Sequence, residues 1–287
     1  MRAFAMCIVG ALLCAAPRPA ASADTPPPLP PRPLVLAVPP YLTAAEVERR
    51  FAPLAAYIGR TLGQPVAVRI GGSYAAHIEA IGRDEVDIAF IGPAGYVRVL
   101  ERYGSKPPLG RFEVGHSPSL RGVIAVPQGS PLRTVAELRG HRFAFGDPES
   151  TMGYFAAAWL LRSCDVPLAA LSAREFLGSH TNVALGVLAG DFDAGAMKRE
   201  VYDEYAMRGL RILAELPPTP DYLFVTRADL PPAAVQRLRA ALLALDQTAA
   251  GARILESLHP GLTRLLPVSE SDYQGVRDMI RAVGRAP

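Results

Sequence analysis

The sequence predicts an α/β protein built from two similar lobes, and three observations support this prediction. Short apolar segments typical of buried strands alternate with helical segments along the chain. This alternation runs from residue 34 to a helix that starts near Ala94, and it starts again in the second half. A short repeat marks both halves: Ser73 opens a helix that leads to Asp87, and Ser179 and Asp193 are spaced identically. Coincidence between two similar βα units is the alternative explanation of that repeat.

In the first half, each of three expected strands is followed by a helix. The first helix has a capping-box start, because Glu46 lies three residues after Thr43. The order β-α-β-α-β-α predicts a mainly parallel sheet covered by helices. The expected strands are 34–38, 66–70 and 86–91, and the expected helices begin at Thr43, Ser73 and near Ala94.

The second half predicts another set of strands and then a helical tail that returns to the first lobe. Lobe 1 would comprise residues 34–122 and 217–287, and lobe 2 residues 123–216, with crossovers near 121–126 and 216–223. The expected strands are 122–126, 142–145, 173–176, 192–196, 211–213 and 222–225. The expected helices are 153–163, one from Ser179, and 231–245, 249–258 and 270–283.

The N-terminus has the features of a secretory signal peptide over residues 1–23. A basic Arg2 precedes an apolar run, and Ala21-Ser22-Ala23 fits the small-x-small cleavage pattern. The apolar run is shorter than the ~20 residues that span a membrane, which disfavours an anchor. A lipoprotein site at Cys14 is disfavoured by the bulky Leu13 before it. Residues 24–33 are proline-rich and predict an extended tether. Because of the signal peptide, we expect a periplasmic protein.

Charge and motifs exclude several functional classes. The chain has 30 Lys and Arg against 27 Asp and Glu, so no global field indicates a nucleic acid or anionic membrane partner. We find no phosphate loop, Gly-x-Gly-x-x-Gly, Gly-x-Ser-x-Gly or metal-ligand pattern. We therefore expect no enzyme, cofactor or metal; a hydrolase that uses Ser150 and His180 is the less favoured alternative.

Four helix starts are candidate anion sites. Ligands of open α/β sheets bind beyond the carboxyl ends of strands, where helix N-termini offer unpaired N–H groups and a favourable dipole. Neutral donors of this kind suit a compact oxyanion. The four starts are Ser73-Tyr74, Gly92-Pro93-Ala94, Ser150-Thr151 and Ser179-His180. Ordinary N-capping is the alternative role of Ser150 and Thr151.

Several segments resemble the periplasmic phosphate-, phosphite- and phosphonate-binding proteins of ABC importers. The resemblance follows the chain in order and covers essentially all of the mature protein. It implies a type II periplasmic-binding fold, with two lobes, a central cleft and two crossover strands, and a permease partner in the inner membrane. The segments are 87–93 with Tyr96, 147–153, 178–184, 190–196 and 267–273.

The resemblance also implies which residues line the cleft. Ser150 and Thr151 would donate to ligand oxygens, and His180 would donate an N–H or contribute a charge. A carboxylate repels a bare oxyanion, so Asp193 would accept from a protonated P–OH or from an amine; capping of a turn is its alternative role. The implied residues are Tyr41, Tyr96, Ser150, Thr151, His180 and Asp193, to which the helix starts add Ser73, Tyr74 and Gly92.

One position departs from the family pattern. Met152 stands where the family usually has a third small hydroxyl residue. One donor is lost and an apolar side chain is gained, which predicts phosphite or an alkylphosphonate as ligand. We expect a monomer that is open without ligand and closes around it; capture of another small organic anion and a sensor role are the alternatives.

Overall fold

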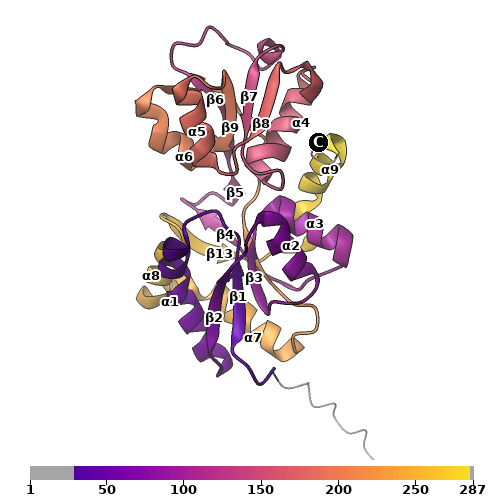
Figure 1. Cartoon of the computed structure of the whole chain (residues 1–287). Helices are drawn as coiled ribbons and strands as arrows, with labels where there is room; N and C mark the ends of the chain where they lie inside the picture. Colours follow the sequence, from indigo (N-terminus) through magenta and orange to yellow (C-terminus); the bar gives the residue numbers. More distant parts are fainter. Residues whose placement is uncertain (1–28, 285–287) are drawn as a thin grey trace, which may run out of the picture.

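The structure is a computed structural model that describes residues 29–284, so the predicted signal peptide and half of the predicted tether lie outside the described residues. Two α/β lobes lie one above the other and are joined by a narrow waist (Figure 1). Each lobe has its own sheet, covered by helices. The predicted fold class is thereby confirmed.

Lobe 1 contains a six-stranded mixed sheet of order β13-β4-β12-β3-β1-β2. β1 pairs in parallel with β2 and β3, whereas β12 and β13 pair antiparallel with their neighbours. The strands are β1 (Leu34–Val38), β2 (Val66–Ile70), β3 (Ile88–Ile91), β4 (Pro108–Val114), β12 (Leu223–Thr226) and β13 (Leu262–Leu266).

Lobe 2 contains a five-stranded mixed sheet of order β10-β6-β9-β7-β8. β7 pairs in parallel with β8 and β9, whereas β6 pairs antiparallel with β9 and β10. The prediction of a mainly parallel sheet is therefore wrong, because β12 and β13 in lobe 1 and β6 in lobe 2 run against the strands beside them. The strands are β6 (Gly122–Pro127), β7 (Arg142–Phe145), β8 (Ala173–Phe176), β9 (Ala194–Lys198) and β10 (Leu210–Glu215).

The lobes are linked by two crossing segments that form a small antiparallel ladder. β5 (Ser119–Leu120) pairs with β11 (Thr219–Pro220). The second crossing lies where the sequence predicts it. The first lies earlier than predicted, because the buried apolar segment at 122–126 is already part of β6 in the sheet of lobe 2.

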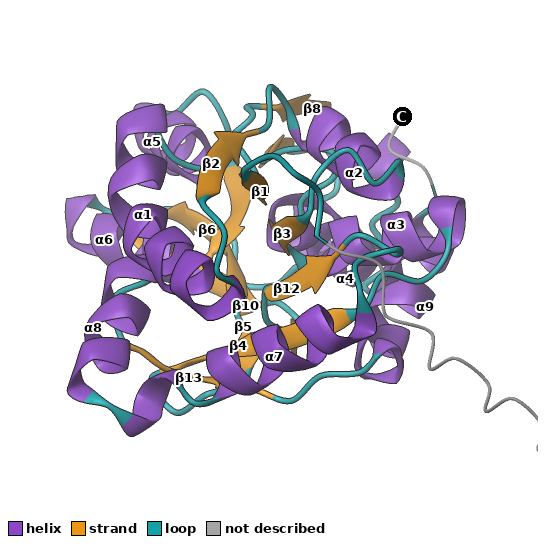
Figure 2. Cartoon of the chain, turned by 90° about the horizontal axis from the view of Figure 1, so that it is seen from below, coloured by secondary structure: helices purple, strands orange, loops and turns teal. Residues whose placement is uncertain are grey.

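Helices cover both faces of the lobe 1 sheet, with α1 on one side and α2 and α3 on the other (Figure 2). Thr43 caps α1 as predicted, and its Oγ1 accepts from the Glu46 N–H. The short α6 was not predicted. The helices are α1 (Ala44–Leu62), α2 (Tyr74–Gly82), α3 (Pro93–Tyr103), α4 (Ala156–Ser163), α5 (His180–Ala189), α6 (Arg199–Tyr205), α7 (Pro232–Leu243), α8 (Ala249–Leu258) and α9 (Gln274–Val283).

The C-terminal helix α9 contacts both lobes. It packs against α3 of lobe 1 and α4 of lobe 2. Arg162 of α4 donates a hydrogen bond to the Ala282 carbonyl at 2.7 Å. The tail therefore returns to the first lobe, as the sequence predicts, and also forms part of the contact between the lobes.

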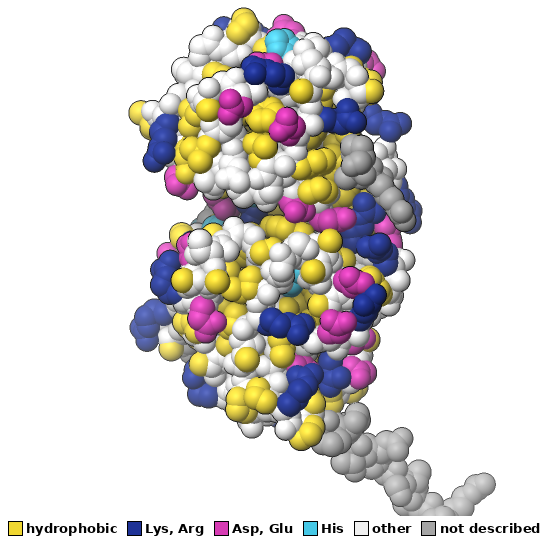
Figure 3. Space-filling model, viewed as in Figure 1, with side chains coloured by type: hydrophobic (Ala, Val, Ile, Leu, Met, Phe, Trp, Pro, Cys, Tyr) yellow, Lys and Arg dark blue, Asp and Glu magenta, His cyan; other side chains and the backbone are white. Residues whose placement is uncertain are grey.

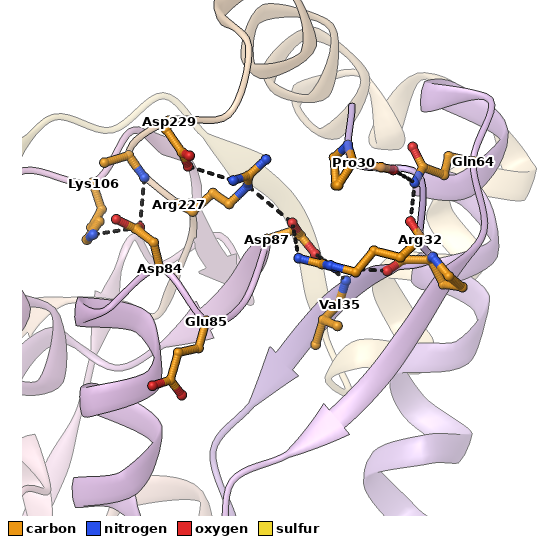
Figure 4. A network of polar contacts seen from close by, with 12 residues as sticks. Pro30, Arg32, Val35, Gln64, Asp84, Glu85, Asp87, Lys106, Arg227 and Asp229 are labelled. Atoms are coloured by element: carbon orange, nitrogen blue, oxygen red, sulfur yellow. Dashed lines mark hydrogen bonds and ion pairs between the residues drawn. The ribbon is translucent and has the colours of Figure 1, made fainter. Parts of the chain in front are cut away.

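The repeat detected in the sequence has a structural counterpart at the outer ends of the two sheets. Asp87 Oδ2 accepts from the Val35 N–H at 2.8 Å, and Asp193 Oδ2 accepts from the Arg142 N–H at 2.9 Å. Figure 4 shows Asp87 between the guanidinium groups of Arg32 and Arg227. Each aspartate thus fixes the start of a neighbouring parallel strand.

Candidate functional site

The four helix starts that the sequence singles out meet in a cleft between the lobes. α2 and α3 belong to lobe 1, and the helical segment that begins at Thr151 and α5 belong to lobe 2. The cleft contains three small cavities. They adjoin one another, because four side chains line more than one of them: Tyr41, Tyr74, Ser150 and Tyr222.

The first cavity, here called the central cavity, lies at the N-terminus of α5. Ser179 caps this helix and accepts from the Asn182 N–H at 3.0 Å, and Gly178 turns the chain with a φ of +77°. A helix N-terminus favours negative charge through its dipole and its unpaired N–H groups. The central cavity is lined by Tyr41, Tyr74, Asp147, Ser150, Gly178, Ser179 and His180.

The Ser150 and Thr151 hydroxyls each accept a hydrogen bond from a backbone N–H near a helix start. Ser150 Oγ accepts from the Gly153 N–H at 3.0 Å, the capping contact that is the alternative role for this residue. Thr151 Oγ1 accepts from the Ala94 N–H of α3 at 2.9 Å, and this bond joins the two lobes. Each hydroxyl keeps its own proton to donate.

His180 is a neutral donor in this environment. Burial, together with the nearby positive charge of Lys198, lowers its pKa to about 3. The Lys198 N–H donates to His180 Nδ1 at 3.3 Å, which leaves the hydrogen of the neutral ring on Nε2. Of the two roles expected for His180, the structure favours the N–H donor over the charge.

A close approach of backbone to side chain positions His180 beside Ser150. A Cβ atom on Gly153 would lie 3.1 Å from His180 Cε1 and 2.9 Å from Ser150 Oγ. A larger residue here would have to displace the Ser150 hydroxyl and push the imidazole away, so glycine favours this packing. The helical segment that carries Ser150 and Thr151 can then lie directly against the imidazole.

A second cavity, here called the lysine cavity, was not predicted from the sequence. Lys198 Nζ lies 4.4 Å from the ring centroid of Tyr222 and 5.6 Å from that of Tyr41. Lys198 is the last residue of β9, and one clue to it is that it is one of only two lysines in the chain. The lysine cavity is lined by Tyr41, Phe90, Phe112, Val114, Leu120, Lys198, Glu200, Asp221, Tyr222 and His259.

Carboxylates in the cleft have shifted pKa values with distinct causes. Burial raises the pKa of Asp221 to about 6 and also raises that of Asp147. Burial acts in the same direction on Glu200, but hydrogen bonding to His259 and the charge of Lys198 outweigh it, so that its pKa falls to about 2. His259 Nε2 lies 3.1 Å from Glu200 Oε2, which forms a second contact between the lobes.

Tyrosines close the lobe 1 side of the cleft. Burial raises the pKa of Tyr41 to about 12 and the pKa values of Tyr74 and Tyr222 well above their usual range, so all three hydroxyls stay protonated.

Acidic and basic side chains lie side by side at the waist between the lobes (Figure 3). One such pair is Arg98 and Glu149, 3.4 Å apart across the cleft.

Three residues expected in the cleft lie elsewhere, and this corrects the sequence interpretation. Tyr96 is fully buried in the core of lobe 1, with its ring 5.1 Å from that of Tyr273. Met152 is buried against Gly122 of β6, where its size leaves no room for a Cβ on that glycine. Its side chain points into the core of lobe 2 and does not line the three cavities.

Asp193 is the third residue, and the topology explains its position. α5 begins at the cleft and runs away from it, and β9 returns, so Asp193 at the start of that return lies at the far end. There it pairs with Arg142 at 2.8 Å and with His141 at 3.3 Å. Ser73 stays at the start of α2 as a cap, with its Oγ accepting from the Ala76 N–H at 3.0 Å.

The structure brings six of the expected residues to the cleft: Tyr41, Tyr74, Gly92, Ser150, Thr151 and His180. A triad of Ser150, His180 and Asp193 does not assemble, because the aspartate is remote and His180 Nδ1 accepts from a backbone N–H.

Among residues 29–284 no group of three or more potential ligands could hold a metal ion. No helix of the same residues is long and apolar enough to cross a membrane.

Comparison with known proteins places the chain in a family. The sequence profile of the family described as "ABC transporter, phosphonate, periplasmic substrate-binding protein" matches residues 36–273. The chain is 26% identical over 175 residues to the Phosphate-import protein PhnD of Mycolicibacterium smegmatis, a match that spans 58% of this chain and 54% of that protein. The chain thus spans about half the length of the curated relative it matches.

Solved structures show the same fold at low identity. PhnD1 from Prochlorococcus marinus in complex with methylphosphonate has a TM-score of 0.79 at 19% identity, over 88% of this chain and 99% of that one. A binding protein component of a phosphonate ABC transporter from Pseudomonas aeruginosa has a TM-score of 0.76 at 18% identity, over 88% and 86%. The aliphatic sulphonate-binding protein SsuA from Escherichia coli has a TM-score of 0.61 at 17% identity, over 88% of each chain.

The fold, the cleft with its converging helix starts and the profile match over residues 36–273 agree. The chain belongs to the non-enzymatic family of periplasmic substrate-binding proteins of phosphonate ABC transporters.

Proposed function

We propose that this protein captures a phosphorus oxyanion between its two lobes and delivers it to an ABC permease. The observation that supports this most strongly is the convergence of neutral donors on the central cavity. Ser150, the N-terminus of α5 and His180 all line that cavity, and Thr151 lies beside them at the contact between the lobes. Neutral, pre-oriented donors bind a small anion without the desolvation cost of a buried countercharge.

The protonation state of the ligand follows from Asp147. This carboxylate lines the central cavity, and its Oδ1 accepts from the Glu149 N–H at 2.8 Å. A carboxylate repels a fully ionised oxyanion, but it accepts a hydrogen bond from a P–OH group. Asp147 therefore takes the role that the sequence interpretation gave to Asp193, and it favours a monoprotonated phosphorus oxyanion over sulfate.

The ligand we propose is phosphite or an alkylphosphonate. The rings of Tyr41 and Tyr74 border the same cavity as the donors, so an apolar substituent on phosphorus can pack against them.

Calorimetry tests this proposal with methylphosphonate, phosphite, phosphate and sulfate titrated into the purified mature chain. We expect methylphosphonate or phosphite to bind most tightly and sulfate to bind weakly. Inorganic phosphate binding far more tightly than either would overturn the ligand assignment. Binding of none of the four would overturn the proposed function.

The proposed location and partners follow from the family. Export through the predicted signal peptide would place the chain in the periplasm as a monomer, with a permease of the inner membrane as its partner. Cell fractionation with an antibody against the chain tests the location. The mature protein should appear in the periplasmic fraction with residues 1–23 removed, and retention in the cytoplasm at full length would contradict the proposal.

A further inference from the structure

The side chain of Lys198 places an ammonium group in the cleft. Lys198 ends β9 at the cleft, and its ammonium lies over the rings of Tyr222 and Tyr41. Among residues 29–284 the Nζ atom forms no hydrogen bond and no ion pair. The two tyrosine rings are therefore its direct contacts, and such cation–π contacts favour an ammonium group.

Carboxylates surround the lysine cavity at longer range. Glu200 and Asp221 line the cavity together with Lys198. The Lys198 charge favours the ionised form of each carboxylate, although burial raises the net pKa of Asp221. Glu200 also pairs with His259, and Asp221 accepts from the adjacent Tyr222 N–H at 2.6 Å. Two aromatic rings and two carboxylates are the chemical groups that recognise an ammonium ion.

The lysine cavity adjoins the site proposed for the oxyanion. Tyr41 lines both the central cavity and the lysine cavity. A substituent on a bound phosphorus that extends past Tyr41 therefore approaches the Lys198 ammonium. A neutral or apolar substituent can pack on the tyrosine rings, whereas a second ammonium meets a like charge at short range.

We propose that Lys198 is a specificity-determining residue whose ammonium occupies the position that a ligand ammonium would otherwise take, so that the cleft accepts phosphonates without an amine and rejects aminoalkylphosphonates. This inference rests on the proposed function. It assigns a role to the side chain alone, because the Lys198 backbone N–H that holds His180 is present whatever the side chain.

Calorimetry on Lys198→Met tests the inference, with methylphosphonate and 2-aminoethylphosphonate as probes. In the wild-type protein we expect methylphosphonate to bind at least tenfold more tightly than 2-aminoethylphosphonate. In Lys198→Met we expect that ratio of dissociation constants to fall at least tenfold in favour of the amine, because Glu200 and Asp221 then face an empty ammonium position. Lys198→Arg keeps the charge and should keep the wild-type preference.

Arg208→Met is a matched control, because Arg208 also lies over a tyrosine ring, that of Tyr205 at 4.7 Å, but outside the three cavities. It should leave the ratio unchanged. Lys198→Gln is measured as well, so that a folding defect of the methionine variant does not decide the result. A ratio that stays within twofold of wild type in the folded Lys198 variants overturns the inference alone. A wild-type protein that binds neither phosphonate overturns the proposed function and the inference with it.

Discussion

Thr151 of lobe 2 accepts a hydrogen bond from the Ala94 N–H of lobe 1 at 2.9 Å, and both groups are buried. The N-terminus of α3 is therefore capped by a residue from the opposite lobe. Separation of the two lobes would break this bond, so we expect the hydroxyl that we propose as a ligand donor also to link ligand binding to closure.

Thr151→Val should weaken both closure and ligand binding. The valine leaves the buried Ala94 N–H without an acceptor in the closed state, which costs about 1–3 kcal/mol. We expect affinity for methylphosphonate to fall at least tenfold, measured by calorimetry. Thr151→Ser retains the hydroxyl and serves as the control; equal affinities of the valine and serine variants would show that the hydroxyl plays no part.

His180 should make the protein less stable in mild acid. Its pKa is lowered to about 3 by burial in the folded protein, whereas an unfolded histidine titrates near 6.5. The unfolded state therefore takes up a proton first as the pH falls, so stability is full above about pH 6.5 and declines towards pH 3. At pH 5 this loss is about 2 kcal/mol.

Urea unfolding of the ligand-free protein at pH 7 and pH 5 measures this effect. His180→Gln removes the titrating group, so its stability should change less between the two pH values than that of the wild type. Identical pH dependence in the two proteins would show that the folded state does not hold His180 neutral.

Changing Asp147 to asparagine should alter ligand affinity, whereas changing Asp193 to asparagine should alter stability. Asp147→Asn removes the charge from the central cavity. The affinity for phosphonates relative to that for sulfate should change at least fivefold, in favour of sulfate. Asp193→Asn weakens the ion pair with Arg142 at the far end of lobe 2 and should lower the melting temperature with ligand affinity unchanged. Calorimetry and thermal melts distinguish the two; an affinity loss confined to the Asp193 variant would restore the original assignment.

Met152→Ser should destabilise the protein without adding a ligand contact. The methionine side chain is buried against Gly122, so a serine leaves a cavity and costs about 2–5 kcal/mol, as core truncations do. Affinity for phosphate relative to methylphosphonate should stay the same. A gain in phosphate affinity, as expected if this position faced the ligand, would contradict the placement of Met152 in the core.

The sequence predicted most strands and helices of the two lobes because their patterns are local. Pro108–Val114 and Leu262–Leu266 were missed as strands, since their partners are each other and β12, far away in the chain. The antiparallel pairings next to the crossovers have the same origin. Pairing direction depends on how the chain returns between lobes, which no local pattern records.

For the candidate site, residues at helix starts could be assigned to the cleft from the sequence, because a start signal fixes which end of a helix carries the residue. Ser150, Thr151 and His180 are of this kind. Tyr96 and Met152 lie further into the helical segments that follow these starts. There the rotation of the helix decides whether a side chain faces the cleft or the core. Lys198 escaped detection because it lies at the end of a strand and its partners, Tyr41 and Tyr222, come from the other lobe.

A crystal structure with methylphosphonate bound tests the central claim most directly. We predict phosphoryl oxygens within about 2.7–3.2 Å of Ser150 Oγ, Thr151 Oγ1 and His180 Nε2, with the methyl group against the ring of Tyr41. A ligand bound outside the cleft, or held in it without contact to any of these three donors, would contradict the account.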